Sequence, residues 1–300
     1  MNIGILTIND FGFHPNQRFA QAAKKLGHDI ILINPYKMLS TLKNNEFGFS
    51  VNGMAKMPDI ILPRQGSPMG DYGLCLMRQF EQMGIPFVNG LEGVTIARNQ
   101  YITLQALAAS RIPVPSSCFI TEKINFSEAV DLLGGYPVVV KQVDGMGGDG
   151  VIKVDRLEQA IPFLDRHLSQ KKGMIVQAFI QPEGRMDIRL LVVGKKVVGA
   201  MKLEPGQQDF RANIHQKGQA KAIEPSPLWI DLAVAAATAC CLEIAGVDMI
   251  VEKKGNPKII EVNYSPGFKG LEAATGFDIA GKIMEYVDFK LNKRKQPGKE

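Results

Sequence analysis

The stretch GVDMIVEKKGNPKIIEVNYSPG, residues 246–267, carries acidic residues inside two apolar runs that Gly-Asn-Pro separates. Two apolar runs joined by turn residues predict a β-hairpin. If residues 255–256 form a two-residue turn, Asp248 lies opposite Asn263, and Glu261 points to the same side of the hairpin. Carboxylate and amide oxygens are ligands that suit Mg²⁺. The pattern therefore predicts a metal site made of these three residues.

The alternative to a metal site is that Asp248 and Glu261 lie on the water-exposed face of an edge hairpin. The residues that flank Asp248 and Glu261 are nearly all apolar, and an unpaired carboxylate in apolar surroundings is costly. A bound cation would remove that cost, which favours the metal site.

A glycine-rich loop lies upstream, in YPVVVKQVDGMGGDGVIKV, residues 136–154. A dinucleotide-binding loop is followed by a helix, whereas VIKV predicts a strand. We therefore expect a flap between two strands whose peptide N–H groups cover the phosphates of a nucleotide. A plain hairpin is the alternative, but a turn needs fewer glycines. The loop glycines are Gly145, Gly147, Gly148 and Gly150.

Charged and amide side chains near the loop and the hairpin extend the candidate site. Lys141 ends the strand before the loop, where its ammonium group could pair with phosphate oxygens. Asp187 and Arg189 occur in DIR, and Arg211 and Asn213 occur in DFRAN. The arginines could clamp phosphates or stabilise an oxyanion. For each residue alone, a surface salt bridge or a solvated side chain is the alternative.

Residues 1–92 alternate between apolar strand-like runs and amphipathic helices, beginning with NIGILTI and NQRFAQAAKKLG. This alternation predicts a parallel sheet covered by helices, and ligands bind at the carboxyl ends of such strands. Arg64 directly follows the run PDIILP. It is therefore a candidate substrate contact, with a surface arginine that caps a loop as the alternative.

The rest of the chain predicts longer helices and a second hairpin. Residues 94–110 predict one helix, and residues 228–246 predict another. DIRLLVVGKKVVGAMKLE, residues 187–204, predicts an antiparallel hairpin that turns at residues 194–195.

The overall composition is that of an ordinary globular protein, with 45% hydrophobic and 22% charged residues among 300. The start of the chain lacks the pattern of a signal peptide, and we expect no membrane-spanning segment. The four cysteines have no metal-ligand spacing and lie in apolar or mixed runs. We expect them to be free thiols, which are typical of the reducing cytoplasm. No serine or cysteine triad pattern and no zinc pattern is present.

The formal charge of +5 is concentrated at the end of the chain. Residues 290–300 hold five basic residues and one acidic residue, which leaves 30 basic and 29 acidic residues elsewhere. We expect a flexible basic tail and no direct nucleic-acid binding, because no aromatic stacking platform accompanies the charge. An RNA-associated protein, or an arm for an acidic partner, is the alternative.

These motifs together resemble the ATP-grasp superfamily, and more narrowly the RimK-type alpha-L-glutamate ligases, whose namesake modifies ribosomal protein S6. The similar segments include PRQGS, PVVVKQVDGMGGDGV, DIRLLVVG, DFRAN and AGVDMIVEKKGNPKIIEVNYSPGFKG. They span nearly the whole chain.

The resemblance implies an α/β plus α+β fold, with a parallel-sheet pre-ATP-grasp domain followed by a two-lobed ATP-grasp fold. The expected divisions are residues 1–97, a lobe with the glycine flap at 98–180, a lobe with the metal hairpin at 181–289, and the basic tail.

The resemblance also implies a reaction. In it, ATP activates a carboxylate as an acyl-phosphate, and an amine displaces phosphate to form an amide. Two Mg²⁺ or Mn²⁺ ions and a homo-oligomer are further expectations. The expected substrates are L-glutamate and a protein or peptide carboxyl terminus, with ribosomal protein S6 as one acceptor. The family pattern implies that Arg211, Asn213 and Lys141 act in catalysis and that the nucleotide is bound by these three, the loop glycines, Ala178, Phe179, Asp187, Arg189 and Ala212.

Three positions depart from the family pattern. Members usually have Lys at Gln100, Glu at Ala178, and a pair of arginines near residues 202–203. The first two changes affect nucleotide contacts, and the third affects recognition of a substrate carboxylate. Alternatives that remain open are a ligase for another amino acid, a small-molecule or carrier-protein acceptor, and a non-catalytic protein that binds nucleotide as a regulator.

Overall fold

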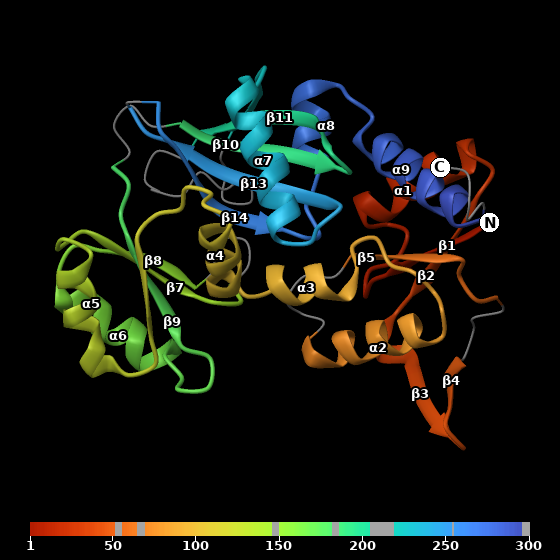
Figure 1. Ribbon diagram of the computed structural model, residues 1–300, viewed down its shortest axis with the longest axis horizontal. Coiled ribbons are helices and arrows are strands. Elements are labelled where there is room, and N and C mark those ends of the chain that lie inside the picture. The colour runs from red at the N-terminus through yellow and green to blue at the C-terminus, as the bar shows by residue number, and fades with distance from the viewer. Residues whose placement is uncertain are drawn as a thin grey trace.

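The computed structural model describes residues 1–51, 56–64, 70–145, 150–181, 186–204, 219–253 and 255–295. In Figure 1 a parallel sheet with its helices lies at one end of the molecule, a small lobe with its own sheet lies at the other, and a larger sheet spans the top. Both ends of the chain lie beside the parallel sheet. The predicted order of an α/β part followed by two α+β lobes is confirmed.

The N-terminal sheet has the order β2-β1-β5, with all strands parallel. Helix α1 follows β1 and helix α2 follows β5, as the alternating sequence predicts. The predicted fourth strand is reduced to one bridge between Ile61 and Phe87, because Pro86 beside it has no N–H to donate. The bounds are β1 (Asn2–Leu6), α1 (His14–Lys25), β2 (Asp29–Ile33), β5 (Ile60–Pro63) and α2 (Gly70–Gln82).

A hairpin of β3 (Met38–Lys43) and β4 (Glu46–Val51) was not expected from the sequence. Its turn residues Asn44 and Asn45 have φ angles of 53° and 64°. Paired positive φ values suit a tight hairpin turn, and asparagine tolerates them. The Asn-Asn pair was therefore the signal for this hairpin.

The single helix predicted over residues 94–110 is two helices, α3 (Leu91–Ala97) and α4 (Gln100–Ala109). Asn99 separates them, and its Oδ1 accepts hydrogen bonds from the N–H groups of Tyr101 (3.0 Å) and Ile102 (3.1 Å). Such a cap starts a new helix. The prediction was wrong here because the apolar pattern continues through the cap.

The small lobe contains a sheet of order β6-β9-β7-β8 that carries the glycine loop between its last two strands. Helices α5 and α6 pack against one face of it, through Phe126 and Leu164. The other face points toward the large sheet (Figure 1). The bounds are β6 (Ser117–Ile120), α5 (Phe126–Leu132), β7 (Val138–Gln142), β8 (Val151–Val154), α6 (Leu157–His167) and β9 (Met174–Ala178).

The large sheet is antiparallel, with the order β12-β11-β10-β13-β14. The predicted turn at residues 194–195 is confirmed, because Val193 pairs with Lys196. Helix α7 packs on one face through Ala233, Ala236 and Ala237. The bounds are β10 (Met186–Val193), β11 (Lys196–Glu204), β12 (Gln219–Ala222), α7 (Pro227–Ala239), β13 (Ile244–Val251) and β14 (Pro257–Asn263).

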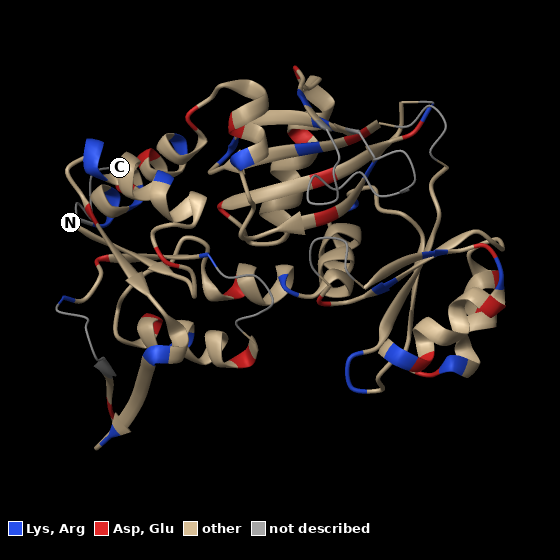
Figure 2. Cartoon of the chain, turned by 180° about the vertical axis from the view of Figure 1, so that it is seen from behind, with Lys and Arg blue, Asp and Glu red and all other residues tan. Residues whose placement is uncertain are grey.

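The chain ends in α8 (Lys269–Thr275) and α9 (Ile279–Lys295). We expected a flexible tail to begin at residue 290, but residues 290–295 belong to helix α9. Leu291 is buried, and Lys290 Nζ lies 2.6 Å from Glu243 Oε1. Residues 296–300 lie outside the described residues. Figure 2 shows basic and acidic positions mixed along α9 and over the small lobe.

The N-terminal part and the large sheet share their hydrophobic cores. One core joins Leu6 and Phe80 to Val247, and a second joins Ile3 and Phe19 to Phe268. The small lobe instead has a core of residues between 118 and 168 together with β9. We call the first assembly the body and the second the flap lobe.

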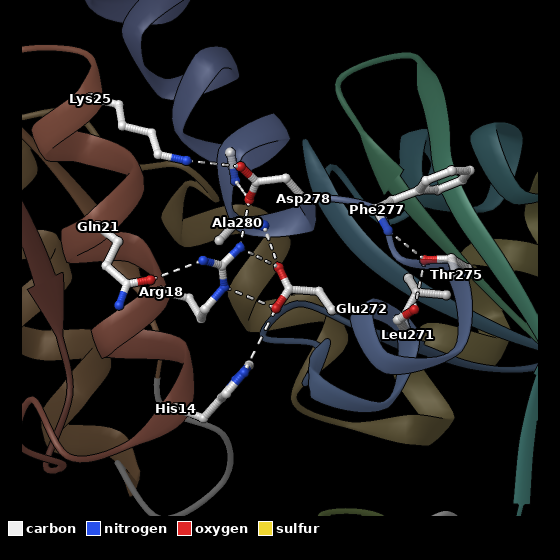
Figure 3. A network of polar contacts seen from close by, with 11 residues as sticks. His14, Arg18, Gln21, Lys25, Leu271, Glu272, Thr275, Phe277, Asp278 and Ala280 are labelled. Carbon is white, nitrogen blue, oxygen red and sulfur yellow. Dashed lines mark hydrogen bonds and ion pairs between the residues drawn. The ribbon is translucent and has the colours of Figure 1, made fainter.

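An ionic network reinforces the body where α1 meets α8 and α9 (Figure 3). Arg18 Nε and Nη2 donate to the carboxylate of Glu272 at 3.1 and 3.3 Å, and Nη2 also lies 2.8 Å from Asp278 Oδ1. The N–H of Ala280 donates to Glu272 at 3.1 Å. Several hydrogen bonds to one partly buried carboxylate hold these helices more firmly than an isolated surface pair would.

Candidate active site

The metal hairpin has a register that differs from the predicted one. Asp248 pairs with Glu261, and Asn263 pairs with Gly246. The predicted pairing of Asp248 with Asn263 is therefore wrong. A bulge between Asp248 and Met249 shifts the register, and the turn is longer than two residues.

The turn occupies residues 252–256, between the end of β13 and the start of β14. The N–H of Gly255 donates to the carbonyl of Glu252 at 2.8 Å, and Gly255 has a φ of 83°. A turn that ends in a left-handed glycine is the usual form of a longer hairpin loop. Sequence spacing alone did not distinguish it from a two-residue turn.

The three predicted metal ligands nevertheless share one face. Asp248 and Glu261 lie directly opposite each other, and Asn263 lies two residues beyond Glu261 on the same strand. The Asn263 side chain also forms a hydrogen bond with Glu261 that favours the charged carboxylate. The prediction of a shared face holds although its register was wrong.

The carboxylates of Asp248 and Glu261 repel each other across this pair of strands. Burial raises the pKa of Glu261, and the charge of Asp248 raises it further. Arg189 and Lys141 act in the opposite direction. Like charges directly opposite each other destabilise a sheet, so this face favours a bound cation.

Arg189 forms a salt bridge with Asp248 across the pairing of β10 and β13. Arg189 Nε donates to Asp248 Oδ1 at 2.6 Å, and Nη2 donates to Oδ2. Burial would lower the pKa of Arg189, but the adjacent carboxylate raises it overall. The guanidinium therefore orients a predicted metal ligand, in addition to any contact with nucleotide.

Lys141, in β7 of the flap lobe, also lies near Glu261. Burial lowers the pKa of its ammonium group to about 8, while the charge of Glu261 raises it. A cation that gives up hydration gains most from a nearby anion. Lys141 and Glu261 thus face a common space from two different sheets.

The residues present fit a divalent cation. Two carboxylates and one side-chain amide share this face, and Asp248 Oδ1 and Oδ2 each keep a second lone pair when Arg189 donates to them. Within the described ranges, no three His, Cys, Asp or Glu side chains gather into a metal cluster. The amide of Asn263 supplies the third donor that such a cluster lacks.

The glycine loop joins β7 and β8, so its predicted strand–loop–strand setting is confirmed. Gly150 has a φ of 75°, and a Cβ there would lie 2.2 Å from Gln142 Oε1. Gln142 Nε2 lies 3.0 Å from His167 Nδ1. The end of the loop therefore rests on a side chain that α6 holds, a contact the sequence analysis missed. Gly145 is described just before the loop, whereas Gly147 and Gly148 lie outside the described residues.

The other predicted nucleotide contacts lie at the ends of strands. Ala178 ends β9, where its N–H donates to the Ser116 carbonyl at 2.9 Å, and Phe179 follows it. Asp187 is buried in β10, opposite Leu203. Arg211, Ala212 and Asn213 lie outside the described residues.

Arg64 lies at the carboxyl end of β5, beside the segment that follows β14. Its Nη2 donates to the carbonyl of Pro266 at 2.7 Å, and its guanidinium carbon lies 5.4 Å from the ring centre of Phe19 and 5.9 Å from that of Phe268. Burial lowers its pKa to about 10. Arg64 thus connects the parallel sheet to the segment that follows Asn263.

The structure also describes the positions that depart from the family pattern. The N–H of Gln100 donates to the carbonyl of Val143, at the base of the flap, at 2.8 Å. Lys202 lies opposite Lys221 on the neighbouring strand β12.

Comparison with known families matches the description RimK PreATP-grasp domain over residues 1–94 and RimK-like ATP-grasp domain over residues 97–287. The chain belongs to the RimK-like ATP-grasp family. It is therefore an ADP-forming ligase of the ATP-grasp type. Among the described residues, no helix has the length and apolar character needed to cross a bilayer.

A curated relative and two solved structures agree with this assignment. A probable alpha-L-glutamate ligase from Legionella pneumophila (strain Corby) is 34% identical over 292 residues, covering 97% of this chain and 96% of the relative. The D-alanine–D-alanine ligase of Bacillus anthracis, solved with ATP, has a TM-score of 0.73 at 21% identity, with coverage of 99% and 100%. The ATP-grasp ligase PsnB, solved with a precursor variant, Mg and ADP, has a TM-score of 0.72 at 18% identity, with coverage of 97% and 98%. The two solved structures support the fold.

Proposed function

We propose that this protein uses ATP to join the amino group of L-glutamate to a carboxyl group at the end of a peptide or protein. The observation that carries the proposal is the face on which Asp248, Glu261 and Asn263 meet Lys141 from the opposite lobe. The relative named as a glutamate ligase supports the amino acid. The solved ligase with a bound precursor supports a peptide-like acceptor.

In the proposed nucleotide site, the phosphates lie between the glycine loop and the metal hairpin. Lys141 binds phosphate oxygens, and a bound anion compensates the loss of hydration that burial imposes on it. The phosphates are covered by the loop glycines Gly145, Gly147, Gly148 and Gly150. The backbone at Ala178 and Phe179 lies along the adenine base. Asp187 lies near the nucleotide from β10.

The reaction has two steps. An acceptor carboxylate oxygen attacks the γ-phosphorus of ATP, the bond to the bridging oxygen breaks, and ADP leaves. The amine of glutamate then attacks the acyl carbon of the acyl-phosphate, loses a proton, and expels inorganic phosphate as the amide forms. We propose that Arg211 and Asn213 stabilise the negative oxygens of both steps, and that the closed loop excludes water from the acyl-phosphate.

Asp248, Glu261 and Asn263 would hold Mg²⁺ or Mn²⁺, with two ions as the expected number. A metal ion there would neutralise charge on the phosphates during transfer. Arg189 keeps the Asp248 carboxylate turned toward this face.

Arg64 is the proposed contact for a substrate carboxylate. Arg64 as a whole is only 8% exposed, and among the described residues its Nε has no hydrogen-bond partner. A buried guanidinium with an unsatisfied N–H is costly, and a carboxylate matches its geometry. The position at the carboxyl end of β5 is where ligands of such sheets bind.

A ligase of the same fold with another substrate is the second candidate. The observation that favours it is the sequence around Lys202 and Leu203, which lacks the pair of arginines that the family usually has near these positions. A different set of side chains there would recognise a different amino acid or acceptor. Ribosomal protein S6 is one proposed acceptor, and a homo-oligomer is the proposed assembly.

Mass spectrometry tests the proposal. The protein is incubated with Mg-ATP, each amino acid in turn, and peptides with acidic carboxyl ends, and phosphate release is followed in parallel. Glutamyl addition that needs ATP is the expected result. Addition of another amino acid would favour the second candidate, whereas ATP binding without any turnover would contradict both and favour a regulatory protein.

A further inference from the structure

The face of the flap sheet opposite α5 and α6 carries a second lysine. Val138, Val140 and Val154 pack toward those helices, and successive residues of a strand point to opposite faces. Lys141 and Lys153 therefore point to the other face, toward the large sheet. Sequence analysis singled out only the first of them.

The two lysines are diagonal neighbours on this face. Lys141 pairs with Val151, and Lys153 pairs with Val139 on the same two strands. Diagonal positions are close enough for long side chains to reach a common ligand. Asp155 and Glu261 already lie near one ammonium group each, so the spacing is the informative feature: a ligand that contacts both lysines must be longer than a single phosphate.

The surroundings of Lys153 place it at the end of this face away from the glycine loop. Its Nζ lies 5.0 Å from the ring centre of Phe179 and 2.7 Å from Asp155 Oδ1. Phe179 directly follows β9, where the proposed nucleoside end of the site lies. Lys141 stands closer to the loop, on the side of Glu261.

We propose that Lys153 binds the phosphate nearest the nucleoside, the α-phosphate, while Lys141 binds the outer phosphates. This inference rests on the nucleotide site proposed above. Lys153 is 31% exposed on its side chain, so it can leave Asp155 for a phosphate without disrupting the core. The ring of Phe179 holds the ammonium group over the site before nucleotide arrives.

A surface ion pair between Lys153 and Asp155 is the competing interpretation. Such pairs contribute little, and one of them would not affect nucleotide binding. Lys123 offers a matched control, because it is also exposed, also pairs with an aspartate, Asp165, and belongs to the same lobe. It lies at the start of η3 (Lys123–Asn125), just before α5.

Isothermal titration calorimetry with ADP, ATP and adenosine, each with Mg²⁺, tests the proposal. Lys153→Met is expected to raise the Kd of ADP and of ATP by about fivefold each and to leave that of adenosine unchanged. Lys153→Arg should stay within about twofold of the wild type, because it keeps the charge. Lys123→Met should have no effect, and thermal melting verifies that each variant is folded.

The possible failures are distinguishable. Unchanged ADP affinity in Lys153→Met, beside weakened binding in Lys141→Met, would overturn the role of Lys153 and leave the nucleotide site intact. An equal loss of adenosine affinity would overturn the assignment to the α-phosphate. A wild-type protein that binds none of the three ligands would overturn the proposed function together with this inference.

Discussion

The body and the flap lobe are built differently. In the body, both hydrophobic cores contain residues from the N-terminal sheet and from the large sheet, and the Arg18–Glu272 network links their helices. The flap lobe has a core of its own, formed between its sheet and α5 and α6. A unit with its own core can change position without unfolding. The hairpin with Asp248 and Glu261 therefore belongs to the body, whereas the glycine loop and Lys141 belong to the flap lobe.

The largest expected effect comes from removing Glu261, a proposed metal ligand in the body. Glu261→Ala should reduce turnover at least about 100-fold, because charge on the transferring phosphate loses its stabilisation. The measurement is ATP-dependent phosphate release with the acceptor present. Glu252→Ala is the control on the same hairpin, since Glu252 pairs with Lys258 at the surface (2.8 Å). Normal turnover in a folded Glu261→Ala variant would contradict the metal assignment.

Lys141→Met should weaken ATP binding about 10- to 100-fold, the range for a hydrogen bond to a charged group. Titration calorimetry measures it, and unchanged affinity would contradict a phosphate contact.

Lys141→Met should weaken ATP binding but should stabilise the folded protein. The folded pKa of Lys141 is about 8, below its usual 10.5, so the unfolded chain binds this proton more tightly. The charged lysine therefore costs stability below pH 8, and the cost fades as the pH rises from 8 toward 10.5. Lys141→Met should be more stable than the wild type at pH 7, and the gap should narrow above pH 8 in urea unfolding experiments. A gap that widens with pH would show that the lysine is not desolvated.

The ionic network of the body should have a smaller effect. Arg18→Ala is expected to lower the free energy of unfolding by about 1–2 kcal/mol, between the values for exposed and buried pairs. The single tryptophan, Trp229, lies in α7 and packs against a core of the body. Its fluorescence during urea unfolding measures the change. Lys282→Ala, which removes an exposed pair with Glu285, is the control.

The smallest effect on the Trp229 signal should come from a core change in the flap lobe. Leu164→Ala should cost that lobe about 2–5 kcal/mol, and limited proteolysis near α6 should reveal it. The unfolding midpoint reported by Trp229 should stay within error of the wild type. A large shift of that midpoint would show that the flap lobe and the body unfold as one unit.

The sequence predicted most strands and helices and the residue types of the site, because apolar periodicity and turn residues act locally. The pairing of Asp248 was not predictable by counting, since one bulge changes every pair beyond it. The bond from Arg189 to Asp248 joins residues 59 positions apart and depends on how β10 and β13 align. The shared cores of the body depend in the same way on contacts between distant segments.

The salt bridge from Arg189 has a consequence for assembly of the protein. A site with two opposed carboxylates would ordinarily need its metal to fold, because the metal cancels their repulsion. Here the guanidinium supplies a counter-charge from within the chain. Chelation of Mg²⁺ should therefore leave the folded state intact, and an ion bound at the proposed site would be needed for the reaction but not for folding.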